Sequence, residues 1–387
     1  MAPKRGIVPG FFCVRSTPRL TPHSSRGCQN RRRSSDYGSV QRIVRARFVT
    51  TESAGLFAAH ITGPSRIELV ESPEPALKPQ SDGRRQIIFQ PELTCLCGSD
   101  LPFFLRNQEQ PNPEIGHSLH EMIGTVTATD GTRFQSGDRV LCVPHNQLGF
   151  FERYAIHEDR AIPLDSRASD ECALMAQPLG TAIYALKKLP SVMDRDVAVV
   201  GQGPMGQLMC ASLRNLGARE IIAMDLLESR LRTSPGMGAT ATVCNAKEDP
   251  VAAVKRITGG RMAEIVIECV GHQDQALNLC IDLCQPHGRI LFFGVPPEYL
   301  DRVRFRDLFF KNLALYTSVG PDAQRDFPLA MRWIGEGRVD VSKIITHRYP
   351  LSQIQTAFET FRDRKDGALK ILVEFPAYRQ SSARPKP

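Results

Sequence analysis

One glycine motif restricts the fold of this 387-residue chain more than any other feature of its sequence. An apolar run over Asp196–Val200 leads directly into Gly201-Gln-Gly203-Pro204-Met205-Gly206, and an apolar helical pattern follows. In such a strand–turn–helix unit the first glycine permits a tight turn, the second lets backbone amides approach a pyrophosphate, and the third lets the helix pack on the strand. A glycine-rich turn with a purely structural role would need neither flanking element. The motif therefore predicts a dinucleotide site whose phosphates lie against Gly201, Gly203, Pro204, Met205 and Gly206.

Short apolar segments alternate with amphipathic helical segments after this point. The predicted strands are Asp196–Val200, Glu220–Met224, Glu264–Cys269, Arg289–Phe293 and Leu313–Thr317. Such alternation favours an α/β fold with a doubly wound parallel sheet that is covered on both faces. We expect this dinucleotide-binding domain over residues 186–321.

Asp225 ends the second of these strands, where an acid can hydrogen-bond the adenosine ribose hydroxyls. Its carboxylate would repel a 2′-phosphate, and Leu226 and Leu227 provide no compensating cation. The sequence therefore favours NAD over NADP. The alternative is an exposed aspartate that only caps the next helix.

The segments before and after the alternating region have a different pattern. β-Branched and apolar runs with turn signals dominate from residue 55 to about 160, a helical pattern covers 169–189, and a mixed pattern returns after 322. Because 387 residues exceed what one core usually organises, we expect two domains. The second, β-rich domain is predicted to comprise residues 49–185 and 322–387.

Positive charge is concentrated in a leader. Residues 1–50 contain eleven basic side chains and a single acid, Asp36, so the rest of the chain is near neutral despite a net charge of +8. The folded part therefore lacks the basic face that nucleic acid would require, and no apolar run reaches the ~20 residues that span a bilayer. We expect neither a nucleic-acid partner nor a membrane partner.

The leader, residues 1–48, is rich in Ser and Arg and has no apolar secretory core. It resembles an organelle transit peptide, or it reflects a wrongly assigned start with the protein beginning at Val49. The scattered cysteines favour reduced thiols. We expect a cytoplasmic protein, or a mitochondrial or plastid protein if the leader is a transit peptide.

Two short segments upstream of the glycine motif carry ligand-type side chains. Cys97-Gly98-Ser99-Asp100 is followed at a distance by His120-Glu121. A thiolate, an imidazole and a carboxylate are ligands that zinc accepts, and three protein ligands leave a fourth position for water or substrate. A single Cys or His is more often simply packed, so the residue types alone leave both readings open.

The order of these motifs resembles the zinc-containing medium-chain dehydrogenase family, and within it the sorbitol/polyol/threonine dehydrogenase-like branch. The resemblance covers residues 55–375. It rests on Cys97–Asp100, His120-Glu-x-x-Gly-x-Val126, Gly137-Asp-Arg-Val140, the glycine motif, Glu268-Cys-Val-Gly271 and Gly288–Gly294. It implies a Rossmann domain inserted into a GroES-like catalytic domain, in a homo-oligomer (dimer or tetramer). The implied activity is zinc-dependent hydride transfer between a secondary alcohol or polyol and NAD.

The resemblance also implies roles for single residues. Cys97, His120 and Glu121 would be the catalytic zinc ligands, Ser99 would relay the proton of the substrate, and Asp100 would orient His120. The backbone of Gly294 and Val295 would line the nicotinamide. Gly116-His117 also looks like the start of the histidine motif, but Ser118 would then replace the acid, and the Gly124 and Val126 spacing fits His120.

Two departures from the family pattern change what we expect. Between Asp138 and Glu152 the chain is too short for the lobe that holds a structural zinc in many relatives, so we expect one catalytic zinc per subunit and no structural zinc. Cys280 and Cys284 lie four residues apart in a predicted helix and are expected in the core.

The second departure is Gln177, where the polyol branch usually has Glu. A neutral amide beside the metal would leave the site less anionic, which we hypothesise lowers the pKa of bound alcohol. Replacing Gln177 with Glu would then change the pH–rate profile. Altered specificity or weakened metal retention are alternatives.

Two rival functions remain. A zinc-free quinone or enone reductase on the same scaffold would explain Gln177 and the missing lobe, but not the joint presence of Cys97, Ser99, His120 and Glu121. A non-catalytic NAD-binding or nucleic-acid-binding protein has only the basic leader in its favour. Which alcohol is the substrate is not encoded in any spacing; Phe103, Phe104, His145 and Phe150 are candidates for lining its pocket.

Overall fold

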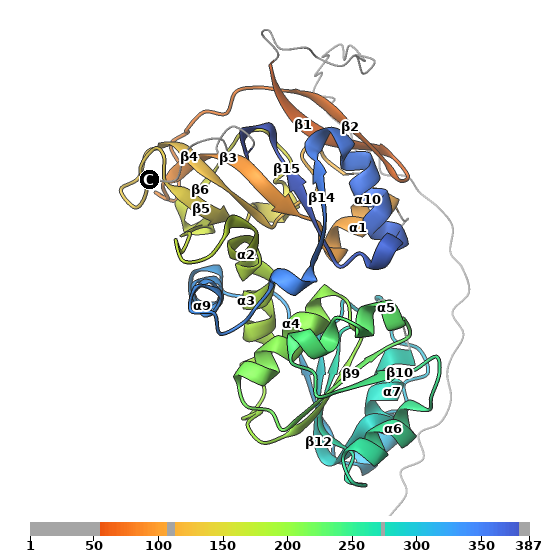
Figure 1. The fold of residues 1–387 in the computed structure, drawn as a ribbon. Coiled ribbons are helices and arrows are strands. Elements are labelled where there is room, and N and C mark those ends of the chain that lie inside the picture. Colours follow the sequence, from red (N-terminus) through yellow and green to blue (C-terminus); the bar gives the residue numbers. More distant parts are fainter. Residues whose placement is uncertain (1–54, 107–112, 272–274, 379–387) are drawn as a thin grey trace, which may run out of the picture. The chain divides into compact units, whose positions relative to one another are not determined.

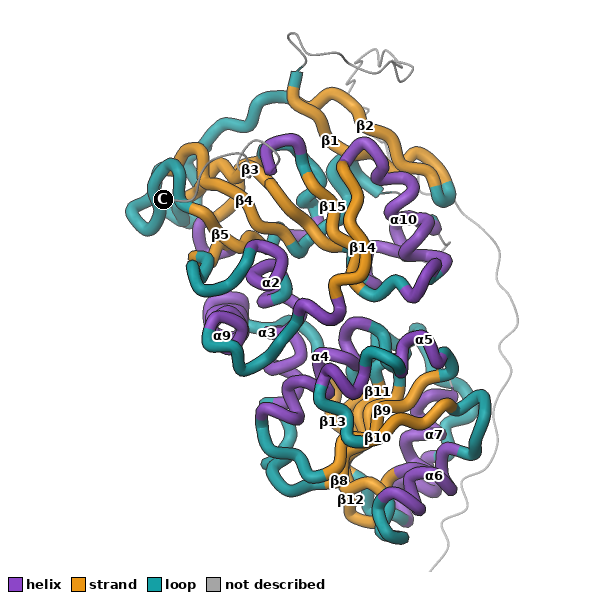
Figure 2. The backbone as a smooth tube through the Cα atoms, in the orientation of Figure 1, coloured by secondary structure: helices purple, strands orange, loops and turns teal. Residues whose placement is uncertain are grey.

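The computed structural model describes residues 55–106, 113–271 and 275–378 (Figure 1). These residues form a mixed α/β structure with sheets of two, six and seven strands (Figure 2). The predicted α/β class with a parallel sheet is thereby confirmed. The leader, residues 1–48, lies outside the described residues.

The six-stranded sheet has the strand order of dinucleotide-binding folds. In space its order is β10-β9-β8-β11-β12-β13, and all its pairs are parallel. In sequence order this is 3-2-1-4-5-6, the order in which a cofactor lies across the reversal point between the first and fourth strands. The strands are β8 (Asp196–Val200), β9 (Glu220–Asp225), β10 (Ala241–Cys244), β11 (Ala263–Glu268), β12 (Cys284–Phe292) and β13 (Ala314–Thr317).

The helices of this part connect the parallel strands. They are α4 (Pro204–Asn215), α5 (Glu228–Leu231), α6 (Pro250–Ile257), α7 (Gln275–Leu283) and α8 (Phe305–Phe310). Helix α7 ends at Leu283, and Cys284 is the first residue of β12, so the prediction that Cys280 and Cys284 share a helix was wrong. Both thiols are free and buried, as expected for core positions.

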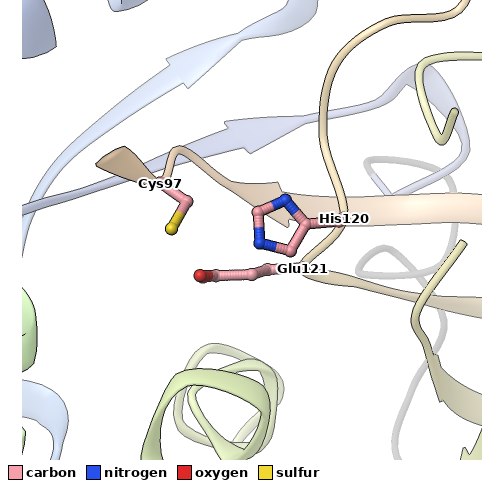
Figure 3. A group of neighbouring side chains, drawn as sticks. All are labelled: Cys97, His120 and Glu121. Atoms are coloured by element: carbon pink, nitrogen blue, oxygen red, sulfur yellow. The ribbon is translucent and has the colours of Figure 1, made fainter. Parts of the chain in front are cut away.

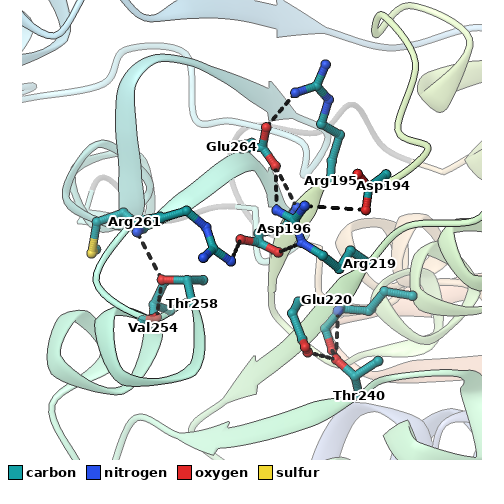
Figure 4. A network of polar contacts seen from close by, with 12 residues as sticks. Asp194, Arg195, Asp196, Arg219, Glu220, Thr240, Val254, Thr258, Arg261 and Glu264 are labelled. Atoms are coloured by element: carbon teal, nitrogen blue, oxygen red, sulfur yellow. Dashed lines mark hydrogen bonds and ion pairs between the residues drawn. The ribbon is translucent and has the colours of Figure 1, made fainter.

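A network of charges ties the amino ends of three neighbouring strands (Figure 4). The fully buried Asp196 accepts hydrogen bonds from Arg219 at 2.7 Å and Arg261 at 3.0 Å, and Glu264 accepts the backbone N–H of Asp196 at 3.0 Å. Burial acts to raise the pKa of Asp196, but the two arginines outweigh it and hold the pKa below its ordinary value. The opposite, carboxyl edge of the sheet begins at the glycine motif.

The seven-stranded sheet joins segments from both sides of the parallel sheet in sequence. Its path is β14-β15-β3-β4-β5-β7, and β6 also pairs with β3. The strands are β3 (Gln86–Cys95), β4 (Met122–Thr129), β5 (Arg139–Cys142), β6 (Tyr154–His157), β7 (Ala161–Pro163), β14 (Ile345–Pro350) and β15 (Lys370–Glu374). A separate hairpin contains β1 (Leu56–Gly63) and β2 (Arg66–Ser72).

Aromatic side chains fill the core of the seven-stranded sheet. Phe104 and Phe150 are fully buried in this core, and Phe104 packs at 4.8 Å against Phe358, so the structure gives them a packing role and not the pocket role expected from the sequence. The accompanying helices are α1 (Leu101–Leu105), α2 (Asp170–Leu174), α3 (Ala176–Leu186), α9 (Ala323–Gly335) and α10 (Ile354–Asp363). None of the helices in the described part of the chain is long and apolar enough to cross a membrane.

Candidate metal and cofactor sites

The pairing of β3 with β4 explains how two distant segments meet. The strands are antiparallel, with Thr94 opposite Met122, so the carboxyl end of β3 lies beside the amino end of β4. Cys97 lies two residues after the end of β3, and Glu121 immediately precedes β4. The carbonyl of Glu121 accepts the hydroxyl of Thr94 at 2.7 Å and the N–H of Cys95 at 3.1 Å, which fixes the register.

Cys97, His120 and Glu121 form one compact group of ligand atoms (Figure 3). One sulfur, one imidazole nitrogen and one carboxylate oxygen all lie within 4.8 Å of one another. Among the residues that the structure describes, this is the only group of three or more Cys, His, Asp and Glu side chains arranged in this way. The buried Oε1 of Glu121 has no hydrogen-bond partner. The donor types, their number and an unpaired buried acceptor all fit a zinc ion.

His117 is engaged elsewhere. Its Nδ1 accepts the N–H of Glu114 at 2.8 Å, and its Nε2 lies 3.0 Å from the carbonyl oxygen of Asn146. Its ring also stacks on Phe103, with the centroids 4.7 Å apart. Because both ring nitrogens have partners, the geometry favours His120 over His117 as a ligand.

We therefore expect different results from replacing the two histidines. His120→Ala should lose bound zinc, because one of three ligands is gone, whereas His117→Ala should retain it and lose only local packing. Zinc per folded chain, measured by elemental analysis after dialysis, distinguishes the two. Full zinc retention in His120→Ala would contradict the assignment.

Asp100 connects the two ligand segments. It is fully buried, and its carboxylate accepts the N–H of Cys97 at 2.7 Å and the N–H of Leu119 at 3.1 Å. Its Oδ1 lies 3.7 Å from Nδ1 of His120, too far for a hydrogen bond. Burial acts to raise the pKa of Asp100, but His120 and the two N–H groups lower it below its ordinary value. Asp100 thus holds the backbone beside two of the three candidate ligands.

Lys370 is a site residue that the sequence did not reveal. Its Nζ lies 2.6 Å from Oε2 of Glu121, and both side chains are 1% exposed. Burial alone would lower the pKa of Lys370, but Cys95, Glu121 and Cys97 raise it above its ordinary value, so the side chain is a cation. Lys370 begins β15, which pairs with β3, and it is 249 residues from Glu121 in sequence. No local motif could have indicated this pair.

Ser99 and Gln177 have different surroundings. Ser99 lies in a 3₁₀ turn over Gly98–Asp100, and its Oγ is buried without a hydrogen-bond partner among the described residues. Gln177 is buried in the first turn of α3. Within the described ranges, no hydrogen bond joins its side chain to Cys97, His120 or Glu121. The effect of Gln177 on the pKa of bound alcohol therefore stays a hypothesis.

The glycine motif forms a turn that other residues could not adopt. Gly201 has φ +92°, and a Cβ there would lie 3.0 Å from the backbone carbonyl of Cys269. A Cβ on Gly206 would lie 1.8 Å from the carbonyl oxygen of Gly201. Gly203 is the N-cap of α4, which also contains Pro204 and Met205, and no side chain caps this helix. The first-turn amides of α4 therefore suit a phosphate.

Asp225 is buried and lies beside this turn. Its two carboxylate oxygens accept the N–H of Gln202 at 2.7 Å and the N–H of Leu227 at 2.8 Å. The Nη1 of Arg230 lies 3.7 Å away. Leu226 and Leu227 indeed provide no cation, but α5 places Arg230, which we did not consider from the sequence, near the carboxylate. Asp225 is buried, which disagrees with the alternative that it is an exposed aspartate that only caps the next helix.

Gly294 and Val295 follow β12, at the carboxyl edge of the parallel sheet. The N–H of Gly294 donates to the carboxylate of Glu268 at 3.0 Å, and Val295 is exposed. Their position agrees with a role beside a cofactor that lies across this edge.

Comparisons with known proteins agree with this geometry. Residues 204–336 match the family model described as zinc-binding dehydrogenase. L-threonine 3-dehydrogenase of Coxiella burnetii (strain RSA 493) is 25% identical over 323 residues, which cover 76% of this chain and 93% of the relative. L-threonine 3-dehydrogenase of Bacillus subtilis is 30% identical over 201 residues, 52% of this chain and 57% of the relative.

Solved structures show the same fold. The 2R,3R-butanediol dehydrogenase of Bacillus subtilis has a TM-score of 0.72 at 21% identity, and galactitol-1-phosphate dehydrogenase of Escherichia coli has a TM-score of 0.72 at 19% identity. The butanediol dehydrogenase comparison covers 83% of this chain, the galactitol-1-phosphate dehydrogenase comparison covers 82%, and each covers 99% of the solved chain. An alcohol dehydrogenase of E. coli solved with NADH has a TM-score of 0.72 at 20% identity, and this comparison covers 83% of this chain and 99% of the solved chain.

These comparisons support the family expected from the motifs, the medium-chain, alcohol dehydrogenase-like dehydrogenases. The predicted enzyme class, an NAD-dependent dehydrogenase acting on CH–OH groups, agrees with the names of these threonine, butanediol and galactitol phosphate dehydrogenases.

Proposed function

We propose that this chain is a zinc-dependent oxidoreductase that transfers a hydride between a secondary alcohol or polyol and NAD. The observation that carries the proposal is the convergence of Cys97, His120 and Glu121 into one group of ligand atoms. The dinucleotide-type turn at Gly201–Gly206 would bind NAD, which accepts the hydride. The threonine, butanediol and polyol phosphate substrates named for its relatives all carry a secondary alcohol.

Each candidate residue has a separate task. Cys97, His120 and Glu121 would hold zinc, which when bound supplies a Lewis acid that favours loss of the alcohol proton. The unpartnered Oγ of Ser99 would accept that proton and pass it outward. Asp100 would fix the two ligand segments. NAD would supply the hydride acceptor.

The cofactor is proposed to follow the carboxyl edge of the parallel sheet. The α4 amino end would hold the pyrophosphate, Asp225 the adenosine ribose, and Gly294 and Val295 the nicotinamide. We further propose one catalytic zinc and no structural zinc per subunit. The proposed domains are residues 49–185 with 322–387, and residues 186–321, in a dimer or tetramer.

A substrate and cofactor panel tests the proposal. We expect reduction of NAD, followed at its absorbance band, with at least one of L-threonine, 2,3-butanediol, sorbitol and galactitol 1-phosphate. The rate with NAD should exceed that with NADP, because Asp225 would repel a 2′-phosphate even beside Arg230. A preference for NADP would refute the role of Asp225. Zinc-independent reduction of quinones or enones, without alcohol oxidation, would favour the zinc-free reductase instead.

A further inference from the structure

Glu268 is a buried carboxylate at the carboxyl edge of the parallel sheet. It ends β11, it is fully buried, and both of its carboxylate oxygens are occupied by backbone donors. Oε1 accepts the N–H of Val270 at 2.7 Å and the N–H of Gly271 at 2.9 Å, and Oε2 accepts the N–H of Gly294 at 3.0 Å. Within the described ranges no cation forms an ion pair with it. Among the described residues, backbone N–H groups are therefore the hydrogen-bond donors that meet this carboxylate.

These contacts join two loops that follow adjacent strands. Val270 and Gly271 follow β11, and Gly294 follows β12. The loops touch: a Cβ on Gly294 would lie 2.3 Å from the nitrogen of Gly271 and 2.6 Å from Oε2 of Glu268. A Cβ on Gly271 would lie 2.9 Å from the nitrogen of Val295, and Gly271 has φ +66°. Glu268 thus holds both loops at a spacing that leaves no room for a side chain.

The position of these loops connects them to one half of a dinucleotide. A sheet of this order consists of two mononucleotide-binding halves that meet between β8 and β11. In the first half, Gly201 follows β8 and Asp225 ends β9, whereas Gly271 and Gly294 follow strands of the second half. The two halves should therefore act on different ends of the cofactor.

We infer that Glu268 is a positioning residue for the nicotinamide half of the cofactor, acting through the loops at Gly271 and Gly294. This inference rests on the proposed function. A carboxylate is required because all three partners are donors, and an amide of the same size would turn an N–H toward at least one backbone N–H. The loops would then separate, and the ring would lose its backbone contact while the adenosine half remained bound.

The test compares NAD with ADP-ribose, which lacks the nicotinamide ring, by calorimetric titration of the full chain. In Glu268→Gln we expect the dissociation constant for NAD to rise about tenfold or more and kcat to fall, with ADP-ribose affinity unchanged within about twofold. Glu264→Gln is the matched control: the same change on the same strand, but at its amino end in the network of Figure 4, should alter neither affinity.

A second variant keeps the test valid if Glu268→Gln does not fold. Gly294→Ala pushes the same two loops apart from the other side. It should likewise raise the dissociation constant for NAD and leave that for ADP-ribose unchanged. Equal weakening of both ligands, or no weakening of NAD, in the folded variants would overturn the inference. A wild-type protein that binds neither ligand would refute the proposed function, and the inference with it.

Discussion

Replacing Cys97 with alanine is expected to remove zinc from the protein and to lower kcat/KM for alcohol oxidation by about 10³-fold or more. The thiolate is the soft ligand of the group, and its two partners, an imidazole and a carboxylate, bind zinc much less firmly without it. Zinc per chain and NAD-linked activity should therefore fall together, while circular dichroism shows an unchanged fold.

Cys95 provides the matched control for this experiment. It lies two residues away and is fully buried, and burial, together with its acidic neighbours, raises the pKa of its thiol well above the ordinary value. Cys95→Ala removes a neighbouring thiol of the same size but should keep both zinc and activity. If Cys97→Ala kept zinc and Cys95→Ala lost it, the ligand assignment would be wrong.

Replacing Lys370 with methionine should destabilise the zinc-free protein by about 3–5 kcal/mol, because Glu121 is then buried without its cation. The two atoms are 2.6 Å apart and both side chains are 1% exposed, so water cannot replace the lost partner. Bound zinc would provide a second positive partner for Glu121. The urea midpoint of Lys370→Met should therefore recover when zinc is added.

Lys187→Met is the control for Lys370→Met. It also breaks a 2.6 Å ion pair to a buried carboxylate, Asp326, but the pair joins α3 to α9 and does not involve a candidate ligand. Its destabilisation should be independent of zinc. Equal losses for Lys370→Met with and without zinc would mean that Glu121 does not serve as a ligand.

Local sequence patterns predicted the parallel sheet well, because each strand there is a short, almost continuous apolar run. The strand missed is β10, Ala241–Cys244, which is short and at the edge of the sheet, where burial selects weakly for apolar residues. The end of α7 was also misplaced. Helix and strand follow each other without a break at Leu283, and the turn-type residues Pro286 and Gly288 lie inside β12 instead of at the boundary.

The candidate site was predictable only where its residues are neighbours in sequence or belong to a motif. Spacing favoured His120 over His117, and the structure adds the physical reason: both nitrogens of His117 already have partners. Lys370 was missed because it meets Glu121, 249 residues away, through strand pairing, and no pattern within one segment reveals such a pair. Arg230 is close to Asp225 in sequence, but it approaches the carboxylate only because of the way α5 turns.

The central claim is that a zinc ion held by Cys97, His120 and Glu121 enables NAD-linked alcohol oxidation. The most direct test is to measure zinc per chain and the rate of NAD reduction in the same samples, after stepwise removal of zinc with a chelator and its return. We predict one zinc per chain and a rate proportional to zinc content. A zinc-free protein that oxidises the alcohol at the full rate would contradict the claim.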